Sequence, residues 1–499
     1  MHILRLLLDT TKADCQEINR RFYAYYKVYN IAVTYIRKRL TRLSRNKDYQ
    51  LYKSEYVKLI KKDKLNKQER LRKKELSDHM SEIRNDLGLS KGSLFGYLKI
   101  AHKKYKNLLS SQQVQAIGDR VLCSLDDYLF SDGTCIHYKK FQDIHTIGGK
   151  SNLNGVKFRK ETDSIDWMGL IIPVVIKDTT GYVKDSIDRK IKYCTIERKM
   201  FPNGYHYYVI LTLDGPAPKK LTLEHTDQIC GIDPGVSSVA AVSDTGQILS
   251  ELAPNYKDYN RQIEELNRKI EQSKQIHNPN KYNEDGTYKK GNKEKWVYTN
   301  TCKKMFRKRK TLYRQKSEYI RHSHAKLCNW VLQMARNFIV EAMNYKGLMR
   351  RGKKPAERTE KVSEVKGKLI RKYKKKKRFG SSISNRSPAL FLQILKQKCD
   401  QYGLGYQTVD PRIIKASQYD HVKDEYKKVP LKQRWKEIGG ESVQRDLYSA
   451  YLLQHIDIVT GEIERNGCIS DFEQFVKRQD ELVRQMKEEH ISMKQCFGF

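Results

Sequence analysis

Three acidic residues lie where apolar segments end or begin. Asp233 and Glu341 each close a short apolar run that is typical of a buried strand, and Asp446 stands in an apolar helical stretch. Carboxylate oxygens are the ligands that hard divalent cations prefer. If the three side chains converge, they could hold two Mg²⁺ ions about 3.5–4 Å apart, an arrangement that hydrolyses phosphodiester bonds without a protein nucleophile.

Asp446 is the hardest of the three to explain as a surface residue. It lies on the same predicted helix face as four apolar residues, which are Val443, Leu447, Ala450 and Leu453. A carboxylate buried there alone would cost several kcal/mol, so it needs a cation or a hydrogen-bonding partner.

Each acid taken alone also has a simpler explanation. Asp233 precedes Pro234 and could stabilise a turn, Glu341 could be an exposed residue at a strand end, and Asp446 could pair with Arg445. The three together favour a shared site. No phosphate-binding glycine loop and no His-Glu-x-x-His zinc motif competes with it.

The composition predicts a polyanionic partner. The 499 residues include 98 Lys and Arg against 58 Asp and Glu, a formal net charge of +40, and such a surface attracts phosphates. No run approaches the about 20 apolar residues that span a bilayer, and the first residues lack a secretory pattern, so we expect a cytoplasmic protein without membrane contact. Ten cysteines without a Cys-x-x-Cys pair are expected to be mostly reduced core residues.

The first 220 residues change from helical to strand periodicity. A strand at 3–10 precedes a Lys- and Arg-rich helical region that extends to about 130, with expected breaks at Gly88 and Gly92. Strands are predicted at 169–176, 191–196 and 205–211, the last two joined by a turn at 202–204. We expect a small barrel, completed by the N-terminal strand and interrupted by the helical region.

One helix in this region carries an aromatic stripe and a basic cluster. The stripe recurs at spacings of three and four and consists of Phe22, Tyr25, Tyr26, Tyr29, Val33, Ile36 and Leu40. That period favours burial of the rings over stacking on nucleic acid. Arg37, Lys38 and Arg39 are candidate phosphate contacts.

A second unit begins near residue 227. Strands at 228–233, 238–243 and 247–250 predict an antiparallel meander, and long basic helices at 256–275 and 295–336 lead to a strand at 337–341. A helix from 388 and a strand at 404–409 follow.

The segment 350–378 is strongly basic. It holds 15 Lys or Arg among 29 residues with only three Glu, which predicts a mobile loop or a helix that orders on nucleic acid. Its candidate contacts are Arg371, Lys372, Lys374, Lys375 and Arg378.

The motifs resemble those of a known nuclease family. Segments 231–235, 338–344 and 445–450 are similar, in this order, to the split RuvC nuclease of the TnpB transposon proteins and the compact type V CRISPR effectors. Segments 319–327, 388–391 and 416–418 add to this likeness. The resemblance is specific over 228–455 and rests on layout alone over 1–220.

The resemblance implies a bilobed α/β protein with helical and β-barrel parts. The expected domains are a wedge barrel (1–13 and 140–222), an inserted helical recognition lobe (14–139) and an RNase H-like RuvC domain (223–499) with a basic loop (350–386) and a helical tail (457–499). It implies that Asp233, Glu341 and Asp446 bind Mg²⁺ and cut DNA. The partners would be a guide RNA and a target duplex with a short flanking motif.

One departure from the family concerns segment 417–441. The family carries a four-cysteine zinc ribbon here, whereas this segment has no cysteine, so we expect no zinc and a metal-free substitute packed around Tyr419, Tyr426, Val429 and Trp435. Arg434 or Arg445 could contact the scissile phosphate. The apolar stripe of the tail is expected to pack on the nuclease core, with self-association as the alternative.

Two other functions compete with an RNA-guided DNA endonuclease. A guide-loaded DNA-binding repressor would have no need for three costly carboxylates. An unguided RuvC-like resolvase or RNase H would have no need for the first 220 residues.

Overall fold

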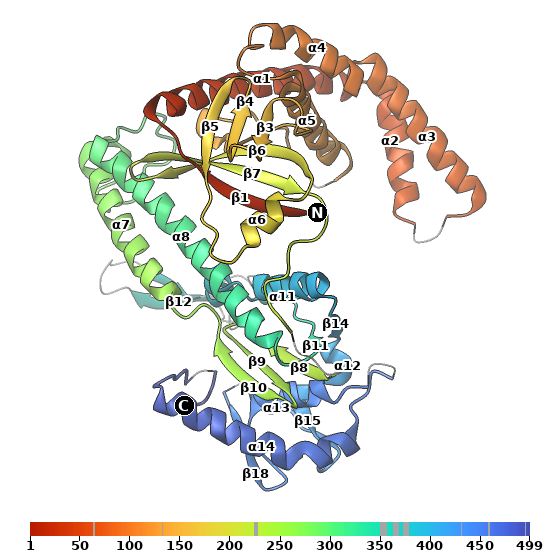
Figure 1. Ribbon diagram of the computed structural model, residues 1–499, viewed down its shortest axis with the longest axis vertical. Helices are drawn as coiled ribbons and strands as arrows, with labels where there is room; N and C mark the ends of the chain where they lie inside the picture. The colour runs from red at the N-terminus through yellow and green to blue at the C-terminus, as the bar shows by residue number, and fades with distance from the viewer. Residues whose placement is uncertain are drawn as a thin grey trace. The chain divides into compact units, whose positions relative to one another are not determined.

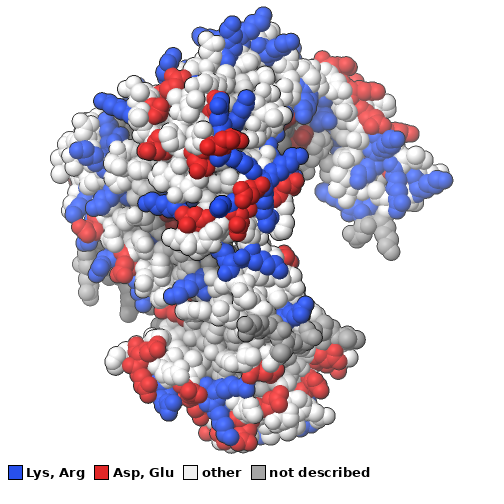
Figure 2. All heavy atoms as spheres, in the orientation of Figure 1, with Lys and Arg blue, Asp and Glu red and all other residues white. Residues whose placement is uncertain are grey.

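The computed structural model describes the chain except residues 63–64, 132, 224–227, 350–356, 363–368, 373–378, 431, 458–459 and 495. The chain forms two compact units, Met1–Pro218 and Lys219–Phe499. No helix in the described ranges is both long enough and apolar enough to cross a membrane. Lys and Arg side chains are spread over the face drawn in Figure 2, with Asp and Glu among them.

The first unit contains a curled antiparallel sheet of seven strands. In spatial order they are β2 (Thr146–Gly148), β6 (Ile191–Phe201), β7 (Gly204–Leu213), β1 (His2–Leu8), β5 (Leu170–Val175), β4 (Ser164–Trp167) and β3 (Val156–Arg159). The N-terminal strand lies between β7 and β5, so its predicted place in the sheet is confirmed. The sequence did not predict β2, β3 and β4, which have only three or four residues each and too few alternations for a clear period.

Five helices separate β1 from the rest of this sheet. They are α1 (Lys12–Leu43), α2 (Lys47–Ile60), α3 (Lys67–Asp86), α4 (Lys91–Lys103) and α5 (Ser111–Phe130), and a short helix α6 (Tyr182–Ile187) follows β5. The break at Gly88, with φ +71°, is confirmed. The break expected at Gly92 is wrong, because Gly92 is the second residue of α4, which begins after the capping side chain of Ser90.

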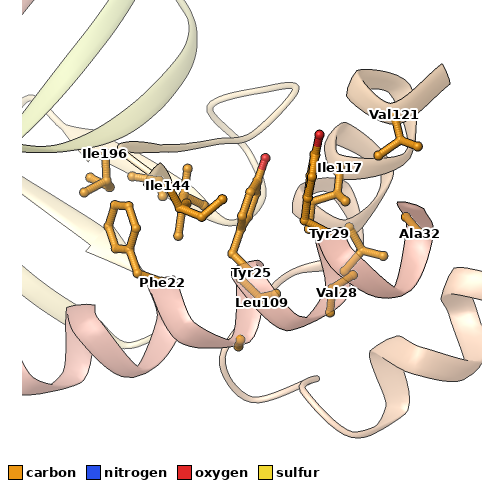
Figure 3. Close-up of a cluster of buried hydrophobic side chains, with 14 of the residues drawn as sticks. Phe22, Tyr25, Val28, Tyr29, Ala32, Leu109, Ile117, Val121, Ile144 and Ile196 are labelled. Carbon is orange, nitrogen blue, oxygen red and sulfur yellow. The ribbon is translucent and has the colours of Figure 1, made fainter. Parts of the chain in front are cut away.

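The aromatic stripe of α1 is core, as its period predicts. Figure 3 shows Phe22, Tyr25 and Tyr29 among apolar side chains of α5 and the sheet. Within this core Arg198 of β6 is 1% exposed, and its guanidinium lies 4.4 Å from the Phe22 ring centroid and 4.2 Å from that of Phe141. A buried cation between aromatic faces therefore joins α1 to the sheet.

The second unit is built on a five-stranded mixed sheet. In spatial order its strands are β10 (Gly246–Glu251), β9 (Ser238–Ser243), β8 (Ile229–Pro234), β11 (Asn337–Glu341) and β14 (Gly405–Val409). Strands β8, β9 and β10 form the predicted antiparallel meander, whereas β8, β11 and β14 run parallel. The central strands β8 and β11 are covered on both faces, which explains their apolar runs, whereas the edge strand β14 has exposed polar residues.

Helices cover the two faces of this sheet. The remaining helices of the unit are α7 (Tyr256–His277), α8 (Asn300–Val331), α9 (Tyr345–Met349), α10 (Gly380–Arg386), α11 (Pro388–Tyr402), α12 (Pro411–Ile414), α13 (Arg445–Gln454) and α14 (Arg465–Glu488). Figure 1 shows α7 and α8 side by side as a long hairpin. The end of α8 and the length of α11 pack on one face, and α13 and α14 pack on the other. Phe475, Val483 and Met486 of α14 are buried, so the prediction that the tail stripe packs on its own unit is confirmed.

The basic segment falls largely outside the described residues, as do Lys374, Lys375 and Arg378. Its described parts are β12 (Glu357–Val362) and β13 (Leu369–Lys372), which pair with each other. Without nucleic acid these parts are strands; the alternatives of a mobile loop or a helix that orders on nucleic acid stay predictions. Arg371 and Lys372 belong to β13.

Candidate active site

The two parallel strands β8 and β11 place Asp233 and Glu341 at the same edge of the sheet. Val340 is opposite Ile232 in the register, so the next residue of each strand is one of the two acids. Side chains alternate between faces along a strand. Cys230 and Ile232 face α8 and α11, so Asp233 points to the other face, which α13 covers. Glu341 lies on this face for the same reason.

Helix α13 approaches β8 closely because Gly231 has no side chain. A Cβ atom at Gly231 would lie 2.0 Å from the Ala450 carbonyl oxygen and 2.4 Å from the Gln454 nitrogen. This contact brings the helix backbone against the strand that carries Asp233. Asp446 lies in the first turn of α13, with its side chain 13% exposed.

The helix begins later than the sequence predicts. Val443 belongs to a strand, β18 (Glu441–Gln444), which pairs with β17 (Trp435–Ile438) in a tight hairpin. Gln444 caps α13, since its side-chain oxygen accepts a hydrogen bond from the Leu447 amide at 2.8 Å. Leu447, Ala450 and Leu453 are fully buried, as predicted.

The three acids are close enough for two of them, Asp233 and Glu341, to have altered pKa values. Burial raises the pKa of Asp233 well above its usual range, and the negative charges of Glu341 and Asp446 raise it further. Burial also raises the pKa of Glu341, with Asp446 adding to the shift. Three carboxylates in one partly buried site repel one another, so the arrangement favours a bound cation.

Two arginines pair with Asp446. Nη2 of Arg445 lies 3.0 Å from Oδ1 of Asp446, and Nη1 of Arg434 lies 3.5 Å from Oδ2. The β17–β18 hairpin explains this placement, because Arg434 and Arg445 flank its two ends and the Arg445 amide donates to the Arg434 carbonyl at 2.8 Å. The simpler explanation of Asp446 as a partner of Arg445 therefore also holds.

The three carboxylates are chemically suitable ligands for Mg²⁺. Three carboxylates on rigid elements are oxygen ligands for a hard divalent ion, and Asp233 and Glu341 have no ion pair in the part of the chain that the structure describes. The same described part contains no group of three or more His, Cys, Asp or Glu side chains arranged to hold a metal ion. Asp446 faces its arginines instead.

Tyr345 is a site residue that the sequence reasoning missed. It is buried, and the single proton of its hydroxyl is shared between the carbonyls of Pro234 and Gly235, whose oxygens each lie 3.2 Å from the hydroxyl oxygen. Burial raises its pKa, and the charges of Asp233 and Glu341 raise it further. Tyr345 therefore holds the loop after Asp233. Its position four residues after Glu341 was the only feature of the sequence that could have indicated a role at the site.

A groove adjoins Glu341 at the ends of β11 and β14. It encloses about 900 Å³, and its lining includes Asn344, Asp410 and Arg412. The groove is large enough for part of a nucleic acid strand. None of these three residues was a sequence candidate.

Segment 417–441 is held by packing, although not by the residues expected. Tyr419 is buried and Trp435 and Val429 are half-buried, but Tyr426 is 57% exposed. The centre is the fully buried His421, whose Nδ1 lies 2.8 Å from the Tyr448 hydroxyl of α13. Aromatic rings of α13 and α14 surround it. The segment thus packs directly on the helix that carries Asp446.

Stability of the second unit should depend on His421 at mildly acidic pH. Burial lowers the pKa of His421 to about 4, so the unfolded chain binds a proton more readily and stability falls as the pH drops from about 6.5 towards 4. The expected loss is on the order of 3 kcal/mol. Urea unfolding at pH 7.5 and pH 5 should show a smaller pH effect for His421→Phe than for the parent. The exposed His322 provides a control, since His322→Gln should keep the parent's pH effect; equal effects in all three proteins would contradict the assignment.

Of the three basic candidates in the first unit, only two are exposed to solvent and thus free to contact a phosphate. Arg37 and Lys38 are exposed on α1, whereas Arg39 lies 3.3 Å from the Tyr35 ring centroid and is half-buried. Arg37 also stacks on Tyr138, at 5.0 Å. Arg37 and Lys38 remain predictions as phosphate contacts.

Comparison with known proteins gives distant structural matches. No protein-family model and no curated protein matches the sequence. A solved structure titled "Cryo-EM structure of the Cas12f1-sgRNA-target DNA complex" matches 91% of this chain and 98% of its own chain, with 11% identity and a TM-score of 0.45. A second, "Cryo-EM structure of CRISPR-Cas12f Ternary Complex", matches 88% and 81%, with 13% identity and a TM-score of 0.26. These compact type V effectors are the group that the motifs resemble.

Proposed function

We propose that this protein is a Mg²⁺-dependent DNA endonuclease that a bound guide RNA directs to its target. The observation that supports the nuclease part is the proximity of Asp233, Glu341 and Asp446, which come from two adjacent strand ends and one helix. Mutual repulsion of the three carboxylates in a partly buried site lowers the stability of the fold. A function at this site is the simplest reason for the protein to retain them.

The architecture of the second unit supports this proposal. The strand order β10-β9-β8-β11-β14, in which β9 alone runs opposite to the other four strands, is the arrangement expected of an RNase H-like domain. Asp233 and Glu341 lie at the carboxyl ends of its central strands, where ligands of open α/β sheets bind. We propose the domain limits 223–499 for the RuvC-like nuclease, with the wedge barrel and helical lobe as given above.

The guided part rests on the motif resemblance and on charge. The positive charge of +40 is comparable to the roughly 40 phosphates of a 20-base-pair heteroduplex. We propose that the exposed Arg37 and Lys38 contact the nucleic acid backbone and that the first unit reads the flanking duplex.

In the proposed mechanism the side chains position the substrate and the metal, and the metal supplies the chemistry. Bound Mg²⁺ would activate water and stabilise the leaving oxygen. Asp233, Glu341 and Asp446 would hold it, and Tyr345 would keep the Asp233 loop in place through its shared hydrogen bond to the carbonyls of Pro234 and Gly235. Arg434 and Arg445 would orient the scissile phosphate, because a guanidinium binds a phosphate through two parallel hydrogen bonds.

The guided activity is tested by purifying the protein together with its native flanking locus and sequencing the RNA that copurifies. We expect one discrete RNA species. The complex programmed with that RNA should then cut a matching duplex in Mg²⁺ and leave an unmatched duplex intact. Absence of a discrete RNA would contradict the guided part, and an uncut matching duplex would contradict the nuclease part.

A further inference from the structure

Asp446 uses both carboxylate oxygens to bind arginine. Oδ1 accepts from Nε of Arg445 at 3.2 Å and from Nη2 at 3.0 Å, while Oδ2 faces Nη1 of Arg434 at 3.5 Å. The three side chains are 13%, 12% and 20% exposed, so solvent screens the pairing only weakly. A metal ion that approached Asp446 would meet two guanidinium groups.

The neighbouring acids are in the opposite situation. Among the described residues, neither Asp233 nor Glu341 has an ion pair, and their excess negative charge lies beside two positive charges held on Asp446. Without a metal, the two arginine charges therefore offset two of the three carboxylates. Adding a divalent cation would require the arginines to move or to take another anion.

A nucleic acid phosphate is such an anion. Arginine forms the same bidentate hydrogen bonds with a phosphate as with a carboxylate. Nε of Arg434 is buried and has no hydrogen-bond acceptor among the residues that the structure describes, so within them this guanidinium has an unused donor. Both arginines flank one short hairpin, so a shift of its ends would move the two together.

We propose that Arg434 and Arg445 form a clamp that holds Asp446 away from metal until a backbone phosphate draws the guanidinium groups off. This inference rests on the proposed function and adds a form of regulation to it. The metal site becomes complete only when nucleic acid is bound. Coupling between two ligands is reciprocal, so nucleic acid should tighten metal binding by the same factor by which metal tightens nucleic acid binding.

Metal affinity in the absence of nucleic acid tests the clamp. Mn²⁺ is titrated into the full-length protein, freed of nucleic acid, and unbound Mn²⁺ is measured by electron paramagnetic resonance. The site is defined as the binding that Asp233→Asn removes. Arg434→Ala should bind Mn²⁺ at this site about tenfold more tightly than the parent, as expected for loss of one nearby positive charge. Arg434→Lys should remain near the parent.

Two further comparisons keep the test decisive. Arg484→Ala removes the same charge from the exposed face of α14 and should leave the Mn²⁺ affinity of the site unchanged. If Arg434→Ala fails to fold, the parent protein is titrated with a single-stranded oligodeoxynucleotide and with its uncharged methylphosphonate analogue. Only the charged strand should tighten Mn²⁺ binding at the site defined by Asp233→Asn.

The outcomes separate the two hypotheses. The clamp is supported if Arg434→Ala binds Mn²⁺ more tightly than the parent while Arg434→Lys and Arg484→Ala do not. It is also supported if the charged strand tightens Mn²⁺ binding by the parent and the methylphosphonate strand does not. Asp233-dependent binding that is equal in the parent and in Arg434→Ala, or equal with and without the charged strand, overturns the clamp and leaves the proposed nuclease standing. No Asp233-dependent binding in any protein overturns both.

Discussion

Replacing Asp233 with asparagine is expected to abolish Mg²⁺-dependent cleavage and to make the metal-free protein more stable at neutral pH. Loss of a carboxylate ligand should lower the cleavage rate by more than about 100-fold, since even changes around a metal's ligands cost roughly 10–100-fold. Nucleic acid binding should survive, because the phosphate contacts are made by other residues.

The stability gain has a definite pH dependence. The folded pKa of Asp233 is raised above its unfolded value of about 3.9, so its charge destabilises the fold at all pH values above that value. Asparagine removes this penalty. The variant should therefore unfold at a higher temperature than the parent at pH 7.5 in EDTA, and the difference should vanish near pH 4.

A matched control separates a site effect from general loss of negative charge. Asp258, in the first turn of α7, is 65% exposed, and Asp258→Asn should leave cleavage unchanged. Cleavage of a programmed duplex and thermal unfolding are measured for all three proteins. An Asp233→Asn variant that cuts within tenfold of the parent would show that Asp233 is not a metal ligand.

Replacing Gly231 with alanine is expected to destabilise the second unit by about 3 kcal/mol and to impair cleavage. The added Cβ would lie 2.0, 2.4 and 2.8 Å from backbone atoms of Ala450, Gln454 and Leu453. Backbone atoms cannot rotate away as a side chain can, so α13 must move from β8. That movement separates Asp446 from Asp233.

Gly246 provides the control for this substitution. It also lies in the sheet, in β10, but a Cβ there would meet nothing within 4 Å. Gly246→Ala should change stability by less than about 0.5 kcal/mol. Urea unfolding measures both variants. Equal stability of Gly231→Ala and Gly246→Ala would contradict the close packing of α13 on β8.

Local periodicity was enough to predict the parts of the site that depend on nearby residues. The strands that end in Asp233 and Glu341, and the apolar face of the helix after Asp446, follow from alternation and helical spacing over a few residues. The same holds for the buried aromatic stripe of α1. In these segments the local preference and the final environment agree.

Periodicity failed where a distant segment decided the conformation. Residues 441–444 continue the apolar helix pattern, yet they form β18 because Trp435–Ile438 pairs with them. His421 has no periodic neighbours that mark it as core, and it is buried because α13 and α14 close around it. Tyr426 has the aromatic character of a core residue but is exposed on one of two paired strands that have only two residues each.

The sequence by itself determined that three carboxylates would stand at the ends of apolar elements in a strongly basic chain, because residue type and spacing are local properties. Only the tertiary structure decided that β8 and β11 are parallel neighbours in register and that Gly231 admits α13 against them. It alone placed Arg434 on Asp446, beside the adjacent Arg445. Each of these depends on contacts between residues up to about 200 positions apart, and no local pattern encodes which of the possible partners will pack.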